Sequence, residues 1–250
     1  MQDTQQIAAQ ALGLMDLTRL EDDTDDTRVR AMCKRTATAF GHPAAVCVYP
    51  RFIQAAREAL AEIGLADQVA VATVANFPAG KPDPEVAARE IGQAITLGAD
   101  EVDVVFPWRA LLEGDENSGR VLVRKCRLAC ASHPLKVILE SGMLDKPDDV
   151  RRAAKIAIAE GADFIKTSTG KAETGATAQA ARVMLETIRA SGREVGFKVS
   201  GGVRTLDDAC RYMQLAEEIM GPGWVSPQNF RIGASGLLDA LLAELEQDRP

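Results

Sequence analysis

Short apolar runs alternate along the chain with longer stretches rich in Ala, Leu and charged residues. Short runs bounded by turn residues are typical of strands buried on both faces, and the longer stretches are typical of helices with one buried face. The predicted strands are Leu12–Leu17, Ala44–Val48, Val69–Ala75, Glu101–Phe106, Leu135–Glu140, Asp163–Thr167, Val195–Ser200 and Phe230–Ala234. The predicted helices include Thr4–Ala11, Asp83–Leu97, Pro147–Ala159, Ala176–Ala190 and Thr205–Met220.

Several helical stretches carry start and stop signals. Asp83 lies in the sequence Pro-Asp-Pro-Glu, and Thr205 precedes two acidic residues, so both are predicted N-caps. Glycine ends several stretches, as expected for residues that must adopt positive φ. These glycines are Gly64, Gly98, Gly161 and Gly192.

Eight strands that alternate with helices, with no linker between them, predict one (β/α)8 TIM barrel over residues 1–250, of the α/β class. The opening helix is expected to precede the barrel and close its bottom. The alternative is an open doubly wound sheet. Such a sheet usually has a Gly-rich dinucleotide-binding turn after its first strand, and this sequence has none.

Composition narrows the choice of partners. The chain of 250 residues is 46% hydrophobic and 26% charged, with a net charge of −7 and a pI of about 5.0. Without a basic run, nucleic acid and membrane surfaces are not expected partners, whereas a small anion remains possible. The sequence shows no signal-peptide pattern and no long apolar run. Five cysteines, an odd number, fit a reducing compartment, so we expect a cytoplasmic protein.

Two lysines interrupt predicted strands. Lys166 lies in Asp-Phe-Ile-Lys-Thr-Ser-Thr-Gly and Lys198 in Val-Gly-Phe-Lys-Val-Ser-Gly-Gly. Burial disfavours the ammonium form and lowers a lysine pKa, and a nearby second cation lowers it further. A neutral amine is the nucleophile that Schiff-base enzymes need. The alternative for each is a surface lysine on an edge strand or at a strand end.

A weak sequence repeat indicates that an acidic side chain lies close to the first lysine. The sequence Gly-Ala-Asp opens both the fourth and the sixth predicted strand, which carry Asp103 and Lys166 at matching positions. Alternate barrel strands contribute to the same interior layer, so these two side chains are expected to face each other. On the fifth strand Lys136 and Glu140 share one face. Charged side chains gathered around a buried amine indicate a catalytic site.

Glycine-rich turns follow the last two strands. Gly201 and Gly202 end the seventh strand, and Gly233 and Ser235 follow the eighth. Backbone N–H groups of such turns and of helix N-termini can approach an anion closely. Because barrel enzymes often hold phosphate at these two loops, we predict a phosphate site there.

Other candidates are weaker. Cys126, Cys130 and His133 fall on one helical face and could bind a metal, but they read more simply as two half-buried cysteines and a helix-end histidine. Cys47 is interpreted as a packing residue near the site, with reaction toward an aldehyde as the alternative. Asp16 is either a cap or turn residue or a ligand-binding residue.

These segments together resemble the 2-deoxyribose-5-phosphate aldolase family, over about residues 8 to 245. The matching segments are Leu14–Thr18, Glu101–Arg109, Asp163–Lys171, Phe197–Thr205 and Arg231–Ser235. The resemblance implies a class I aldolase that cleaves 2-deoxy-D-ribose 5-phosphate to D-glyceraldehyde 3-phosphate and acetaldehyde. It implies Lys166 as the Schiff-base nucleophile, Lys198 as the lysine that perturbs it, and Asp103 as an acid/base acting with water. No metal or other cofactor is implied.

The resemblance also assigns binding residues and partners. It implies a phosphate site formed by Gly170, Lys171, Gly201, Gly202, Gly233 and Ser235, and a sugar region lined by Asp16, Thr18 and Cys47. Phosphosugar and aldehyde substrates are the implied partners, and the chain is expected to form a homodimer. Two features depart from the family. Gly236 stands where many members have a second serine, and the chain ends Asp-Arg-Pro at residues 248–250, without the terminal tyrosine of some members.

Two other functions stay open from the residues. One is a class I barrel aldolase of transaldolase-like or fructose-bisphosphate type, which would need groups for a longer or doubly phosphorylated substrate. The other is a non-catalytic phosphosugar-binding protein, which would have no use for a buried lysine pair.

Overall fold

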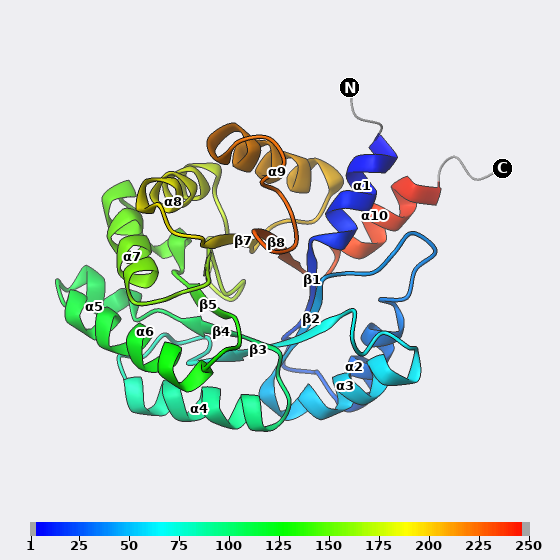
Figure 1. Ribbon diagram of the computed structural model, residues 1–250, viewed down its shortest axis with the longest axis horizontal. Coiled ribbons are helices and arrows are strands. Elements are labelled where there is room, and N and C mark those ends of the chain that lie inside the picture. Colours follow the sequence, from blue (N-terminus) through cyan, green and yellow to red (C-terminus); the bar gives the residue numbers. More distant parts are fainter. Residues whose placement is uncertain (1–3, 247–250) are drawn as a thin grey trace.

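The computed structural model describes residues 4–246, and within them eight parallel strands form a closed barrel in sequence order (Figure 1). The last strand pairs with the first, so no edge is left open. The strands are β1 Met15–Arg19, β2 Ala45–Val48, β3 Ala70–Ala75, β4 Glu101–Val105, β5 Leu135–Ile138, β6 Phe164–Lys166, β7 Gly196–Ser200 and β8 Phe230–Ala234. The predicted TIM barrel is confirmed.

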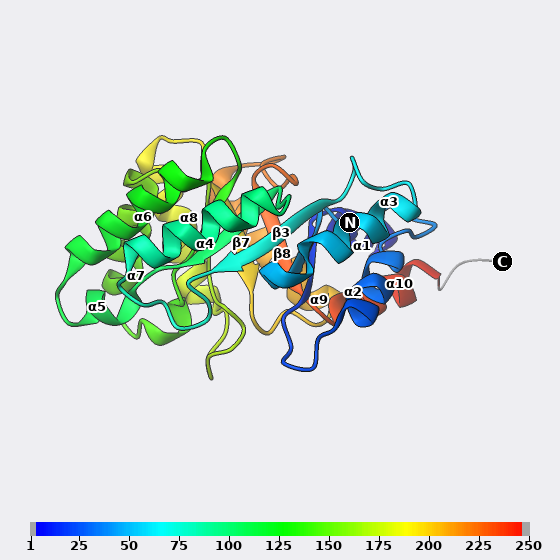
Figure 2. The same cartoon turned by 90° about the horizontal axis from the view of Figure 1, so that it is seen from below.

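Helices surround this barrel (Figures 1 and 2). They are α1 Thr4–Gly13, α2 Asp26–Lys34, α3 Ile53–Glu62, α4 Pro84–Thr96, α5 Trp108–Leu112, α6 Glu116–Cys130, α7 Pro147–Ala159, α8 Ala178–Ser191, α9 Leu206–Met220 and α10 Leu237–Glu246. Short 3-10 turns, η1 Pro50–Phe52 and η2 Ser141–Met143, follow β2 and β5. The first and last helices, α1 and α10, lie side by side.

The opening helix differs from its prediction in extent and position. Helix α1 continues through Leu12, whose side chain is buried, to Gly13, so β1 begins at Met15 rather than at Leu12. Its main contacts are with α10 and α9, which makes α1 part of the outer helical layer. These contacts do not support the expectation that it closes the bottom of the barrel.

Local signals place the other helix ends where the sequence predicted them. The Asp83 side chain accepts a hydrogen bond from the backbone N–H of Val86 and caps α4. Thr205 forms a capping box with Asp208 at the start of α9. Gly192 ends α8 with φ of 64°, a left-handed conformation that glycine adopts without strain.

Two different cores lie on the two sides of the strands. Between strands and helices lies a large apolar core that includes Val46, Val104 and Phe197. Inside the barrel, β2 and β3 contribute only small apolar side chains to a separate cluster. Its members are Leu20, Ala45, Cys47, Ala72 and Val74. Because these side chains are mostly short, they leave space for the long charged side chains that other strands send inward.

The expectation about the chain end, residues 248–250, lies outside the described residues. Among residues 4–246, no helix is long and apolar enough to cross a membrane.

Candidate active site

Two buried lysines share one aspartate inside the barrel. Lys166, the last residue of β6, donates to Oδ2 of Asp103 with an N–O distance of 2.8 Å. Lys198 of β7 donates to the same oxygen at 2.7 Å. The side chains of Lys198 and Asp103 are fully buried, and that of Lys166 is 3% exposed. The predicted facing of Asp103 and Lys166 is therefore confirmed.

A second set of charges lies beneath this pair. Lys136 of β5 donates to Oδ1 of Asp103 at 2.9 Å and also pairs with Glu101. Arg231 of β8 contacts Oδ1 of Asp16 at 2.8 Å and Oε1 of Glu101 at 2.9 Å. The Asp16 carboxylate in turn accepts a hydrogen bond from Lys198. Ion pairs thus connect all of these groups into one buried network.

Burial and charge shift the pKa values of this network in opposite directions. Burial, reinforced by the positive charge of Lys198, lowers the pKa of Lys166 despite the opposing effect of Asp103, which is the direction predicted for it. Burial would also lower the pKa of Lys198, but Asp103 and Asp16 outweigh it and raise that pKa. Lys166 is therefore the lysine of the pair that more readily loses its proton, and a neutral amine can attack a carbonyl carbon.

The Asp103 carboxyl group stays ionised in this environment. Burial alone would raise its pKa, but Lys136, Lys166 and Lys198 together hold the pKa well below its usual range. A carboxylate held between amines can accept a proton directly or through a water molecule. The arrangement thus combines a nucleophile with a proton acceptor.

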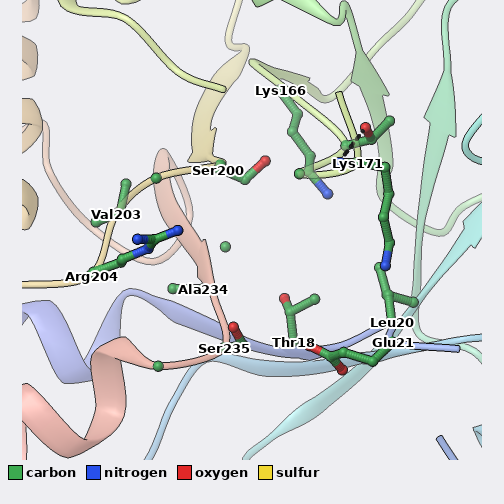
Figure 3. A pocket seen from close by; sticks show the side chains of 16 residues that line it. Thr18, Leu20, Glu21, Lys166, Lys171, Ser200, Val203, Arg204, Ala234 and Ser235 are labelled. Carbon is green, nitrogen blue, oxygen red and sulfur yellow. Dashed lines mark hydrogen bonds between the residues drawn. The ribbon is translucent and has the colours of Figure 1, made fainter. Parts of the chain in front are cut away.

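A cavity of about 440 Å³ opens above Lys166 at the carboxyl ends of β1, β6, β7 and β8 (Figure 3). Barrel enzymes carry their active sites at this end. Eight of the predicted residues line the cavity: Thr18, Lys166, Gly170, Lys171, Gly201, Gly202, Gly233 and Ser235. In Figure 3 the Lys166 amine and the Ser200 hydroxyl point toward its centre.

Two cations of the cavity wall are without an acidic partner. Lys171 and Arg204 form no ion pair with any residue of the described range 4–246, and Figure 3 shows the Arg204 side chain extending along the cavity. One carboxylate, Glu21, also lines the wall, and its Oε2 is buried without a hydrogen-bond partner. A bound anion would therefore meet two available cations and one acid.

Glycine is needed where the loops of the site approach each other. A Cβ atom on Gly175 would lie 2.5 Å from the carbonyl oxygen of Gly201, which accepts a hydrogen bond from Ala176. A Cβ atom on Gly233 would lie 3.0 Å from Cε of Lys198, so this glycine makes room for the buried lysine as well as lining the cavity. A side chain on Gly236, in contrast, would meet no atom within 4 Å.

Four predicted site residues lie below the cavity and do not line it. Asp103 and Lys198 are there as members of the charged network, as described above. Asp16 is fully buried and pairs with Lys198 and Arg231, so it is neither a helix cap nor part of the cavity wall. Cys47 is fully buried in the small apolar cluster, and burial raises the pKa of its thiol. Neither Asp16 nor Cys47 lines the cavity, and their contact with a sugar stays a prediction.

Glu140 does not join the interior charges, which corrects the expectation from strand alternation. Strand β5 ends at Ile138, and Glu140 follows with φ of 55°, which turns the chain out of the strand. Its carboxylate accepts hydrogen bonds from the backbone N–H and the hydroxyl of Thr169, at 3.1 and 2.6 Å. The Thr169 hydroxyl accepts from the backbone of Lys171 at 3.0 Å. Glu140 therefore anchors the loop that carries Lys171.

The two cysteines among the candidate metal ligands, Cys126 and Cys130, belong to the apolar core, whereas His133 is only half-buried. Burial raises the pKa of Cys126 to about 12 and that of Cys130 to about 11. Both side chains are fully buried, rather than half-buried as their helical spacing indicated. Within residues 4–246, no group of three or more His, Cys, Asp and Glu side chains is placed to hold a metal ion.

Sequence reasoning missed several residues of the site. Arg204 and Glu21 line the cavity, and Glu101 and Arg231 complete the buried network. Arg204 is the second residue after the Gly-Gly turn, a position that could have identified it. Glu101 carried a weaker signal, because it occurs at alternate spacing with Asp103 on the same strand.

Comparison with known proteins agrees with this geometry. The family model described as DeoC/LacD family aldolase matches residues 10–241. Among solved structures, a “putative deoxyribose-phosphate aldolase” from Toxoplasma gondii is 27% identical, with a TM-score of 0.90 over 98% of this chain and 99% of that one. Another so named, from Coccidioides immitis, is 26% identical, with a TM-score of 0.82 over 94% and 86%.

A more distant structure shares the fold. Deoxyribose phosphate aldolase from Aeropyrum pernix is 22% identical, with a TM-score of 0.73 over 97% of this chain and 92% of that one. The family match covers nearly the whole barrel, including every strand that contributes a charge to the interior network. The chain therefore belongs to the DeoC/LacD family of aldolases, which are lyases.

Proposed function

We propose that this protein is a class I aldolase that reversibly cleaves 2-deoxy-D-ribose 5-phosphate to D-glyceraldehyde 3-phosphate and acetaldehyde. Such a reaction would serve the breakdown of deoxyribose phosphates. The observation that carries the proposal is Lys166, an almost fully buried amine with a lowered pKa whose tip reaches a cavity that holds two unpaired cations. The names of the similar solved structures support the choice of substrate.

The first step uses the Lys166 amine as a nucleophile. Its lone pair attacks the aldehyde carbon C1 of the open-chain sugar, and the resulting carbinolamine loses water to form a protonated imine. The imine nitrogen then withdraws electrons from the neighbouring carbon atoms. Asp103 lies 2.8 Å from the amine and can accept or return protons during this step, directly or through water.

The second step breaks the C2–C3 bond. A base removes the proton of the C3 hydroxyl, the C2–C3 electrons move toward the imine, and D-glyceraldehyde 3-phosphate leaves. Asp103, acting through a water molecule, is the base we assign, because its carboxylate stays ionised between the lysines. The enamine on Lys166 is then protonated at C2 and hydrolysed, which releases acetaldehyde and restores the amine.

The phosphate group would orient the substrate. The turn carrying Gly201 and Gly202, the turn carrying Gly233 and Ser235, and the cations Lys171 and Arg204 all line the same cavity as Lys166. Binding energy from a group remote from the reacting carbon can hold C1 against the amine and so raise the rate of the chemical step.

Borohydride trapping tests the proposal. The protein is incubated with 2-deoxyribose 5-phosphate, reduced with borohydride and digested, and the modified peptide is identified by mass spectrometry. We expect a reduced substrate or acetaldehyde adduct on Lys166 and none in Lys166→Met. An adduct on another lysine, or no adduct at all, contradicts the assignment.

The choice of substrate is tested separately by acetaldehyde release. We expect release from 2-deoxyribose 5-phosphate and none from ribose 5-phosphate, whose C2 hydroxyl would give glycolaldehyde instead. Trapping on Lys166 without acetaldehyde release would keep the Schiff base but point to another class I barrel aldolase.

A further inference from the structure

The interior of the barrel holds an excess of basic groups. Strands β1 and β4 to β8 each send at least one charged side chain inward, β2 contributes the Cys47 thiol, and β3 contributes no ionisable group. The cations are Lys136, Lys166, Lys198 and Arg231, and the carboxylates are Asp16, Glu101 and Asp103. None of these seven residues is more than 8% exposed. With every group ionised, four positive charges would face three negative ones.

A buried net charge is costly, so the network is most stable when one basic group gives up its proton. The arginine keeps its proton under all ordinary conditions, which leaves the three lysines. With one neutral lysine the charges balance, three against three. The count of residues therefore predicts one uncharged amine in the network.

Geometry selects which lysine this is. Lys198 pairs with two carboxylates, Asp16 and Asp103, and Lys136 pairs with Glu101 and Asp103 and lies 3.7 Å from Asp16. Lys166 contacts one carboxylate oxygen only, that of Asp103, and shares it with Lys198. The amine with the fewest acidic partners holds its proton least firmly.

We propose that Arg231 and Glu101 are positioning residues that keep Lys166 as the one uncharged amine of this network. Neither lines the cavity, and both lie near the amino ends of their strands, β8 and β4, away from the substrate. Arg231 donates hydrogen bonds to one oxygen of Asp16 and both oxygens of Glu101. Because its charge is fixed, the fully ionised network has one more cation than it has carboxylates. Glu101 is one of the three carboxylates that this count includes, and its ion pair with Lys136 favours the charged form of that lysine.

The test measures the protonation of Lys166 without requiring catalysis. Cyanate carbamylates only neutral amines, so the rate of Lys166 carbamylation against pH, followed by peptide mass spectrometry, reports its pKa. The exposed Lys155 in the same digest is the internal reference for the reagent. Arg231→Met removes a cation and should raise the Lys166 midpoint by about one pH unit, the size expected for one buried charge beyond the nearest neighbours at an effective dielectric constant of about 20.

Three further variants complete the design. Glu101→Gln removes a carboxylate and should lower the midpoint by a similar amount. The double variant Arg231→Met with Glu101→Gln, and the charge-conserving Arg231→Lys, should both stay near wild type. Shifts of opposite sign that cancel in the double variant are a result that a loss of packing would not produce.

Two outcomes overturn the inference: a midpoint that is the same in all variants, or single variants that move it in the same direction. If Arg231→Met does not fold, the comparison of Glu101→Gln with the double variant decides, because the double variant must have the higher midpoint. This inference rests on the proposed function, because it explains how Lys166 becomes the neutral nucleophile of that reaction. The two fail separately, because carbamylation needs no substrate and acetaldehyde release needs no pKa measurement.

Discussion

Replacing Lys198 by methionine should raise the pKa of Lys166 and move the acid limb of the pH–rate profile. Both amines lie on the same oxygen of Asp103, at 2.7 and 2.8 Å, so their nitrogen atoms are at most about 5.5 Å apart. Two unit charges at that separation repel each other by about 3 kcal/mol at an effective dielectric constant of about 20. This repulsion corresponds to about two pKa units at 1.36 kcal/mol per unit.

The sign of the effect follows from the form that reacts. The attacking amine must be neutral, and its neutral fraction falls tenfold for each pH unit below its pKa. A rise of about two units in the pKa of Lys166 should therefore reduce kcat/KM about 100-fold at any pH below both values. At a pH above the raised pKa, activity should recover, since the amine itself is unchanged.

The assay is acetaldehyde release measured as kcat/KM from neutral to alkaline pH, because this quantity reports the pKa values of the free enzyme. Lys198→Arg is the matched control, since the guanidinium keeps the positive charge and should leave the limb near its wild-type position. Removing one partner of a buried pair also destabilises a fold by about 3–5 kcal/mol. Thermal unfolding followed by circular dichroism establishes that each variant is folded where it is assayed.

An acid limb that stays in place in Lys198→Met would refute the reasoning, even if activity were lost at every pH. Such a result would mean that Lys198 supports the geometry of Asp103 and Asp16 without setting the charge of Lys166.

Three further predictions concern the cavity. Gly236→Ser should lower KM for the phosphorylated substrate by about tenfold or more, since a hydrogen bond to a charged group contributes roughly 1.5–3 kcal/mol and the position is open. An unchanged ratio of KM for phosphorylated and unphosphorylated sugar would count against it. Glu21→Gln should lower KM for the phosphorylated substrate about twofold to fivefold, because it removes a negative charge from the cavity wall. The control Asp22→Asn, at an exposed position, should leave this KM unchanged. A higher KM in Glu21→Gln would show that Glu21 contacts the substrate favourably. Gly233→Ala should lower stability by about 1–3 kcal/mol in thermal unfolding, because its Cβ would meet Lys198, and an unchanged melting temperature would contradict this.

The fold, the buried Lys166 and the glycine-rich turns at the strand ends could be predicted from the sequence. Strand runs, glycine stops and caps such as Asp83 and Thr205 are local signals, so the barrel could be predicted from them. Lys166 stood out because a charged residue in an apolar run violates the pattern around it. The glycine turns of the cavity followed from the general position of phosphate loops in barrels.

The rest of the site depends on the register between neighbouring strands and on the direction that the chain takes after each strand. Which carboxylates pair with which lysines depends on how adjacent strands are shifted, and no local pattern encodes this. Glu140 was misplaced because the alternation was extended two residues beyond the end of β5, where a positive φ reverses the chain. Arg231 lies in a strand that otherwise reads as apolar, but nothing in its own segment reveals that Glu101, 130 residues away in sequence, is its partner.

The protein uses its cations in two opposite ways, and this difference bears on how substrate binding would affect the protonation of the nucleophile. In the buried network, Lys136, Lys198 and Arg231 are each paired with carboxylates, so by our proposal the excess charge leaves as a proton from Lys166. A phosphate dianion entering the cavity would by itself favour reprotonation of that amine. Lys171 and Arg204 form no ion pair within residues 4–246, so their two positive charges would offset most of the effect of the dianion, with Glu21 opposing them. The two wall cations thus limit how far a bound phosphate would raise the pKa of Lys166, while the buried network sets the pKa of the free enzyme.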